Sequence, residues 1–318
     1  MTHVVVSMGN DSNHFMNKIQ STIVLIVVLI VGFAVAWAGG QNTPRILFIE
    51  GFSIPLMVAA TLVVFVIQWL AFIPAYIKKT EHFYDLIGGM TYVLFIGGIF
   101  VFSQKPDLRA TLLTILVGIW ALRLSLFLFK RVGQDGSDSR FDSIKHNFMG
   151  FLVAWTTQGL WVVITAGCAA AAISAGQKVA LTFVDVAALA IWLLGFSIEV
   201  IADRQKRQFK RQKQKTNPFI CQGLWRYSRH PNYFGEILLW IGLALLAFPA
   251  LSGWQYITLI SPLFVIFLLT KVSGIPLLEA KADQRWQDLV AYQRYKSTTP
   301  VLIPTLSRFW SKTGSIGD

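Results

Sequence analysis

Long apolar runs recur along this chain, and they limit what it can fold into. Hydrophobic residues make up 54% and charged residues only 14% of its 318 positions, whereas a soluble domain carries about a quarter charged residues. A helix needs about 20 apolar residues to cross a membrane. Runs near that length cover residues 21–38, 53–77, 83–103, 110–129, 148–173, 180–201, 233–251 and 254–274. The sequence therefore predicts an all-α, polytopic transmembrane bundle of about eight spans.

The net charge of +12 has its explanation in the membrane. In a soluble protein such a charge would suggest a nucleic-acid partner, but in membrane proteins Lys and Arg mark the cytoplasmic side. With the N-terminus inside, 23 of the 28 basic residues fall on cytoplasmic segments. Those outside are Arg45, Lys105, Arg109 and Lys178, and Arg123 lies within a span. We expect both termini to be cytoplasmic and nucleic acid not to be a partner.

The N-terminal segment and the cysteines exclude other classes of protein. The first 20 residues lack a charged n-region and a small-residue cleavage site, so residues 21–37 are predicted to be a retained span and not a signal peptide. Cys168 lies in an apolar run and Cys221 in a basic loop, which makes a disulfide between them unexpected. Neither has zinc-type spacing to other ligands, and no metal is expected.

A dense polar block at residues 222–236 lies between two apolar runs. Its chemistry-bearing residues are Arg226, Tyr227, Arg229, His230, Asn232, Tyr233 and Glu236. Pro231 suits the first turn of a helix, which leaves the N–H groups from Asn232 onward as donors for an anion on the cytosolic side. Glu236 lies one turn after Asn232, already within the span. An interfacial anchor is the alternative, but it requires neither Asn232 nor a carboxylate at membrane depth.

The approach to this block is basic and helical. Residues 199–211 contain no Gly or Pro, so the sixth span is predicted to continue into the cytosol. Glu199, Asp203, Arg207 and Lys210 recur on one face of that helix. Ordinary positive-inside charge explains the basic residues as well, but not Glu199 at membrane depth. Pro218 predicts a turn around Asn217.

The block resembles the C-terminal domain of the steroid 5-alpha-reductase family, and most closely its bacterial membrane branch, the DUF1295 proteins. The residues that carry the resemblance are Gly223, Leu224, Trp225, Tyr227, Asn232, Tyr233, Gly235, Glu236 and Ile237. Residues 274–279, 284–286, 295–296 and 301–304 resemble the same branch. The resemblance extends from Gln68 to the end and is specific over the last 120 residues. It implies a bacterial inner-membrane protein with a reductase-like cofactor region at 131–318. The apolar runs and the charge pattern predict a cytoplasmic segment at 1–20 and four spans at 21–130 before it.

The family consists of seven-span enzymes that hold NADPH in the cytosolic half of the bundle. The resemblance implies cofactor contacts for Asn232 and Glu236, and equivalents of family residues at Asp203, Arg207 and Lys210. The chain departs from the family at Glu199, where the family has Asn, and at residues 217–218, where it has a Tyr-Arg pair. These departures affect how the nucleotide would lie.

The catalytic half of the family site is not visible. The family uses a Glu after a Gln in an early span and a Tyr in the following span, but here Trp69 follows Gln68, and Trp120 stands at the Tyr position. Tyr84 and Asp85, near Tyr92, are the substitutes that the sequence offers. A Tyr hydroxyl bonded to a carboxyl group can polarise an enone carbonyl. A helix cap and an interfacial aromatic belt form the competing interpretation.

Other polar residues have structural interpretations. Arg123 is expected to pair with a carboxylate or to reach the cytosolic surface, and Gln158, Thr156 and Thr157 either line a pocket or bond between helices. The loop with Asp135, Asp138, Arg140 and Asp142 is expected to be solvated and not to bind metal.

These observations favour a membrane oxidoreductase that reduces an activated C=C bond of a lipophilic, steroid- or isoprenoid-like substrate with NADPH. Arg207, Lys210, Arg226 and Arg229 are expected to meet the phosphates, and Arg285 and Tyr295 to close over the cofactor. The string Arg229-His230-Pro231 also resembles isoprenylcysteine and phospholipid methyltransferases, with Glu279 as the acidic partner that helps to hold S-adenosylmethionine. A lipid-binding protein without activity is a third hypothesis.

Overall fold

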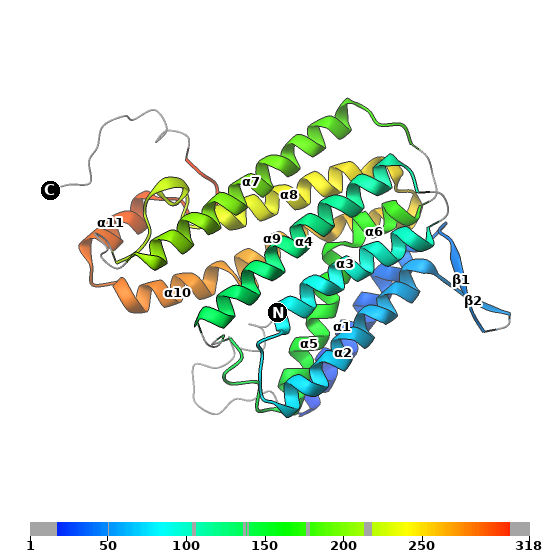
Figure 1. Cartoon of the computed structure of the whole chain (residues 1–318), viewed down its shortest axis with the longest axis horizontal. Helices are drawn as coiled ribbons and strands as arrows, with labels where there is room; N and C mark the ends of the chain where they lie inside the picture. Colours follow the sequence, from blue (N-terminus) through cyan, green and yellow to red (C-terminus); the bar gives the residue numbers. More distant parts are fainter. Residues whose placement is uncertain are drawn as a thin grey trace. The chain divides into compact units, whose positions relative to one another are not determined.

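The chain is almost entirely helical in a computed structural model (Figure 1). The structure describes residues 18–49, 51–103, 106–135, 138, 140–175, 179–212 and 218–305, without the side chains of 47–49, 52, 131, 134 and 135. The predicted turn around Asn217 and most of the N-terminal segment lie outside these ranges. Within them, eight helices are long and apolar enough to cross a membrane. The predicted fold class and the eight spans are thus confirmed.

The first half of the chain contains α1 (Lys18–Gly39), α2 (Leu56–Ile77), α3 (Tyr84–Phe102), α4 (Leu108–Asp135), α5 (Phe148–Thr165) and α6 (Gly167–Ser174). The second half contains α7 (Phe183–Arg211), α8 (Pro231–Ala247), α9 (Ile260–Phe267), α10 (Ile275–Trp286) and α11 (Val290–Thr298). Short 3-10 helices lie at η1 (Gly223–Arg226), η2 (Phe248–Ala250) and η3 (Gly253–Leu259), and a π-helical turn η4 spans Leu268–Val272.

Three predicted spans differ from the observed elements, and the one predicted at 254–274 consists of η3, α9 and η4 in succession. The strand β1 (Arg45–Ile49) pairs antiparallel with β2 (Phe52–Pro55), so the second span begins at Leu56 and not at residue 53. This hairpin extends beyond the neighbouring helix ends (Figure 1). The single span predicted at 148–173 is interrupted at Ala166, where α5 ends and α6 begins.

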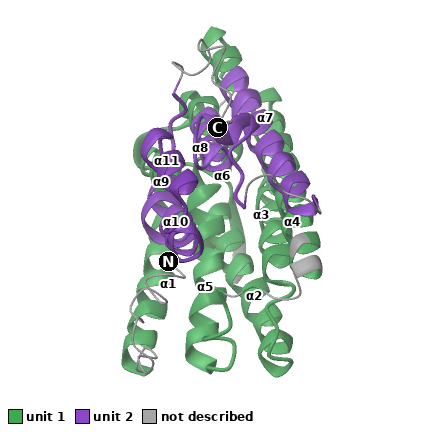
Figure 2. Ribbon diagram, turned by 90° about the vertical axis from the view of Figure 1, so that its left-hand side faces the viewer, with its two compact units in different colours: residues 1–188, 243–265 green, residues 189–242, 266–318 purple. Residues whose placement is uncertain are grey.

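The helices form two compact units, residues 1–188 with 243–265 and residues 189–242 with 266–318 (Figure 2). In the first unit α5 is central: it contacts α1, α2, α3 and α6, and most of its residues are buried. One aromatic cluster there includes Phe72, Tyr84, Phe141, Phe151 and Trp155. The functional boundary expected at residue 130 remains a prediction.

A buried ion pair joins distant elements of the first unit. Arg109, in the first turn of α4, donates to both carboxylate oxygens of Asp185 in α7, and its Nη1 also donates to the carbonyl of Leu246 at 2.7 Å. Both side chains are 1% exposed. Such a pair is costly to break because the remaining charge would be buried alone. It therefore fixes α4 and the start of α7 to the end of α8.

Candidate functional site

Two glycines bring α7 and α8 into close contact in the second unit. A Cβ on Gly235 would lie 2.5 Å from the carbonyl of Gly195 and 2.7 Å from the amide of Glu199. A Cβ on Gly195 would lie 2.6 Å from the carbonyl of Gly235. Small residues permit such backbone contact between membrane helices. The turn of α7 that carries Glu199, 2% exposed, therefore lies against the turn of α8 with Asn232 and Glu236.

The loop before α8 is fixed to the C-terminal part of α7. The helix runs to Arg211, which confirms the prediction that it continues beyond the span. Gly223 has a φ of +62°, and a Cβ there would lie 2.5 Å from the amide of Gln205. Gln205 accepts from the Leu224 amide at 2.9 Å, and the Trp225 indole donates to the Ala202 carbonyl at 3.1 Å. The loop thus has a defined position on α7.

The helix α8 begins at Pro231, as the sequence predicts. The His230 carbonyl accepts from the amide of Phe234 at 3.2 Å, which starts the helical hydrogen bonding. The hydroxyl of Ser228 accepts from the His230 amide at 3.2 Å. His230 is therefore held by its backbone at the first turn of α8.

Arg229, His230 and Glu279 form a triad at this helix start, in which His230 is buried and the other two are half-buried. The carboxylate of Glu279 accepts from Arg229 Nη1 through Oε2, and its Oε1 lies 2.8 Å from His230 Nε2. The His230 ring stacks on Tyr233, with centroids 5.7 Å apart and planes at 7°. His230 is 4% exposed, and burial lowers its pKa. Among the described residues, Nδ1 of His230, Nε of Arg229 and Oδ1 of Asn232 are buried without a hydrogen-bond partner.

A break between α9 and α10 precedes Glu279, the third member of this triad. The π-helical turn η4 follows α9, and Ser273 and Gly274 separate it from α10. A Cβ on Gly274 would lie 2.6 Å from the carbonyl of Leu269 and 2.9 Å from the Tyr233 ring. Pro276 then occupies the first turn of α10, where its missing N–H costs nothing. Isolated π turns often occur at functional sites.

The C-terminal region packs against the polar block, as the composition of the tail predicts. The Tyr295 hydroxyl donates to the Trp225 carbonyl at 2.7 Å, and the Arg229 amide donates to the Pro300 carbonyl at 2.9 Å. Ser228 donates to the Leu302 carbonyl at 2.7 Å. An aromatic cluster lies in the same region and consists of the rings of Phe219, Trp286, Tyr292 and Tyr295. The tail therefore stabilises the loop that carries Arg226 to His230.

The predicted cofactor residues all belong to this unit but differ in exposure. Asp203 is buried, whereas Arg207, Lys210 and Arg285 are exposed on their helices. Arg226, Tyr227, Asn232, Tyr233 and Glu236 are half-buried. The Tyr295 hydroxyl is bonded to the backbone of Trp225, and burial raises its pKa. The roles of Gln205 and of the aromatic cluster were not predicted from the sequence. For the positive φ at residue 223, the only signal in the sequence is that the residue is a glycine.

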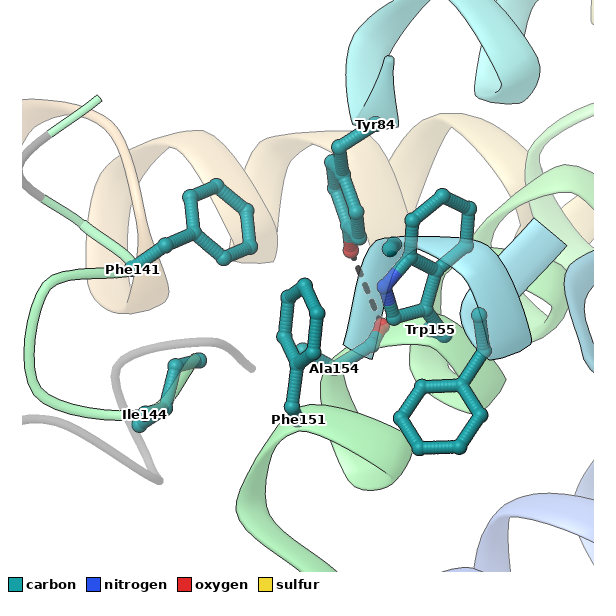
Figure 3. Close-up of a cluster of buried hydrophobic side chains, with 8 residues drawn as sticks. Tyr84, Phe141, Ile144, Phe151, Ala154 and Trp155 are labelled. Atoms are coloured by element: carbon teal, nitrogen blue, oxygen red, sulfur yellow. Dashed lines mark hydrogen bonds between the residues drawn. The ribbon is translucent and has the colours of Figure 1, made fainter. Parts of the chain in front are cut away.

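Tyr84, one of the predicted catalytic residues, lies in the aromatic cluster of the first unit. Its hydroxyl donates to the Ala154 carbonyl at 2.9 Å, and its ring packs against Phe141 and Trp155 (Figure 3). The expected bond between this hydroxyl and a carboxyl group is therefore not formed.

Asp85, the other predicted catalytic residue, lies 3.4 Å from Arg140, which also binds Asp138 at 2.5 Å. These carboxylates raise the pKa of Arg140. Lys145 adds ion pairs to Glu81 and Asp142, so the loop after α4 is a network of ion pairs. The catalytic role of Tyr84 and Asp85 remains a prediction.

Three further polar side chains of the first unit, from Gln158, Thr156 and Gln68, form hydrogen bonds between helices. Gln158 donates to the carbonyl of Tyr84 at 3.0 Å, and Thr156 accepts from the Trp69 indole at 3.1 Å. Gln68 donates to Thr91 at 2.9 Å. Arg123 lies 5.5 Å from the ring of Phe127, one turn along α4.

The chain is similar to proteins of one family. The family model described as "Protein of unknown function (DUF1295)" matches residues 71–299. Curated relatives include the 3-oxo-5-alpha-steroid 4-dehydrogenase 1 of Mus musculus, 27% identical over 37% of this chain and 40% of that protein. The Rattus norvegicus and Bos taurus proteins of the same name are 29% and 31% identical, over 36% and 21% of this chain and 39% and 26% of theirs.

The matched part thus covers about two fifths or less of the length of these curated relatives. No solved structure matches the chain. Because the family model spans more than half of the sequence, the chain belongs to the DUF1295 family.

Proposed function

We propose that this protein is an integral membrane oxidoreductase that reduces an activated C=C bond of a lipophilic substrate with NADPH. The observation that supports the proposal most is a pair of buried polar atoms at the start of α8. Nδ1 of His230 and Oδ1 of Asn232 have no hydrogen-bond partner among the described residues. Buried polar atoms normally have one. These two acceptors call for hydrogen-bond donors on a ligand, and the basic residues of the neighbouring helix suit negative charge elsewhere on the same ligand.

The residues around this site differ in what they offer such a ligand. Arg207 and Lys210 on α7 and Arg226 in η1 would hold phosphate groups, with the N–H groups at the start of α8. Arg229 differs from them because its charge is balanced by Glu279. Asn232 and Glu236 would hold the ribose or nicotinamide end, since they lie further along α8. Arg285 and Tyr295 belong to the tail that would cover the cofactor.

The reaction needs a hydride and a proton. When bound, the cofactor supplies the hydride to one carbon of the C=C bond, and a protein group or water supplies the proton to the other. The sequence suggests Tyr84 and Asp85 for polarising a carbonyl conjugated to that bond, but Tyr84 would act only after its bond to the Ala154 carbonyl breaks, so water is the proposed proton source. A steroid- or isoprenoid-like enone from the bilayer is the proposed substrate class.

Titrating the purified protein in lipid nanodiscs with NADPH tests the proposal. We expect saturable binding in a range of about 1 μM to 1 mM. The double variant R207A/K210A should bind about tenfold more weakly, which corresponds to about 1.4 kcal/mol. The exposed Lys78, in the loop after α2, provides the control K78A, which should bind like the wild type. An absence of binding at millimolar NADPH contradicts the proposal.

A panel of enone lipids then tests the reaction. We expect at least one of them to cause oxidation of bound NADPH and to gain two hydrogens across its C=C bond, as mass spectrometry would show. Binding without oxidation by any lipid would instead favour a lipid-binding protein without activity.

The ion pairing of Glu279 favours a second candidate, a methyltransferase that uses S-adenosylmethionine. Glu279 contacts both Arg229 and His230, as an acidic partner of an Arg-His-Pro block would. Arg207 and Lys210 argue against it, because S-adenosylmethionine carries no phosphate. Saturable binding of S-adenosylmethionine, in place of NADPH, would reverse the order of the two candidates.

A further inference from the structure

His230 is buried, but only one of its ring nitrogens has a partner. Nε2 lies 2.8 Å from the Glu279 carboxylate, and Nδ1 is buried without a hydrogen bond among the described residues. The backbone and the Tyr233 ring fix the orientation of the imidazole. Nδ1 is therefore held in a fixed direction by contacts that do not use it.

The proton on this imidazole can be assigned from its neighbours. A carboxylate oxygen only accepts, so Nε2 carries the proton and Nδ1 has a free lone pair. Glu279 does not force a second proton onto the ring, because Arg229 already balances its charge. Burial lowers the pKa of His230, and Lys206 and Arg229 act in the same direction against Glu279. At neutral pH the imidazole therefore offers a ligand only a hydrogen-bond acceptor, the lone pair of Nδ1.

We propose that Nδ1 of His230 accepts a hydrogen bond from a hydroxyl or amide N–H group of the cofactor, and that it does not contact a phosphate. A phosphate oxygen is itself an acceptor and would repel the lone pair. Asn232 Oδ1, a second buried atom without a partner two residues further on, extends the same preference for donors. Glu279 then acts as a positioning residue for His230. This inference rests on the proposed NADPH site and specifies which part of the ligand this corner binds.

Two substitutions separate the ligand contact from the contact with Glu279. An Asn side chain reaches about as far as Nδ1, and a Gln side chain about as far as Nε2. H230N therefore keeps an acceptor for the ligand and loses the Glu279 bond, whereas H230Q keeps a donor for Glu279 and loses the acceptor. We expect H230Q to unfold at nearly the wild-type temperature but to bind NADPH about tenfold more weakly. H230N should have a lower unfolding temperature and an affinity within about threefold of the wild type.

The pH dependence of NADPH affinity gives an independent test. Acid should weaken binding if a donor group of the ligand faces Nδ1, and strengthen it if a phosphate does. If Nδ1 accepts a hydrogen bond, NADPH affinity falls as His230 gains a proton, and the lowered pKa of His230 places this at a more acid pH than for an ordinary His. If it faces a phosphate, protonation strengthens binding. H230N is the matched control, because the ligand's own titration affects both proteins equally. We expect the ratio of wild-type to H230N affinity to fall by about tenfold between pH 8 and the acid end of the folded range.

The outcomes distinguish this inference from the proposed function. If the wild type binds no NADPH, the proposed function and this inference both fail. If it binds NADPH but H230Q binds equally well, or if acid strengthens wild-type binding relative to H230N, only the inference fails. Should H230N not fold, wild type and H230Q still carry both tests.

Discussion

The hydroxyl of Tyr84 donates to the backbone of α5 from inside an aromatic cluster, and Tyr84 is 4% exposed. A group in that position cannot polarise a substrate carbonyl until the bond to Ala154 breaks. The hydroxyl of Tyr84 thus stabilises the fold whether or not it also takes part in catalysis. Removing it separates its effect on stability from its effect on turnover.

The variant Y84F should lose about 1 kcal/mol of stability, the net value of a typical buried hydrogen bond. NADPH affinity should be unchanged, and turnover with an enone found in the lipid panel should stay within about tenfold, below the 10²-fold or greater effect of losing an acid catalyst. Thermal unfolding and NADPH oxidation measure the two quantities. Y256F is the control: Tyr256 is 44% exposed, so its stability should change by less than about 0.5 kcal/mol. A loss of turnover above 10²-fold with unchanged stability would support the predicted catalytic role.

Residues that act through local spacing were predictable, and those that act through distant contacts were not. Pro231 and Asn232 lie in one helical turn, so their relation follows from the period of the helix. The partner of His230, Glu279, is 49 residues away, beyond a π-helical turn. Glu279 was suggested only by the methyltransferase resemblance, because spacing alone cannot predict which way α10 leaves that turn.

At the level of elements, the contact between α7 and α8 depends on having no side chain at Gly195 and Gly235. The ladder of backbone contacts there leaves no space for a methyl group. It also sets the position of Glu199 relative to the turn that carries Asn232. The site is therefore sensitive to changes that alter no polar group.

The variant G235A tests this dependence. Its new Cβ would meet the carbonyl of Gly195 and the amide of Glu199, so the helices must separate, and we expect a loss of about 1–3 kcal/mol. NADPH affinity should also fall, because Asn232 and Glu236 lie on the displaced helix. The control is G118A in α4, where a Cβ meets no atom within 4 Å and the better helix former should be neutral or stabilising. Equal thermal unfolding of the two variants would contradict the argument.

The missed elements share a physical cause. The strands β1 and β2 pair beside an apolar run, and hydropathy does not distinguish a short apolar strand from the first turn of a span. The break at Ala166 lies within continuous apolar sequence, so only tertiary packing reveals it. Long periodic runs, in contrast, were predicted within a few residues of their ends.

At the level of the whole molecule, the sequence predicts the number of spans because each helix must satisfy its own backbone hydrogen bonds in lipid. That constraint acts on each run separately and contains no information about which helices pack together. The two compact units, each assembled from separate stretches of the chain, depend on such packing. The orientation of the chain in the membrane, unlike its packing, is predictable from the distribution of charge, and it can be tested without a ligand.

Both termini are predicted to be cytoplasmic, and accessible cysteines can test this. In a background with Cys168 and Cys221 replaced, S143C lies in the loop between α4 and α5, and L181C in the loop before α7. Both positions are exposed, so a difference in labelling reports the side of the membrane and not burial. With 23 of 28 basic residues assigned to the inside, the positive-inside rule predicts that a membrane-impermeant maleimide labels L181C in intact cells and S143C only after lysis. Labelling of S143C in intact cells, with L181C protected, would invert the orientation. It would also place Arg207, Lys210 and the start of α8 away from the cytosolic NADPH pool, and the proposed cofactor site would lose its source of ligand.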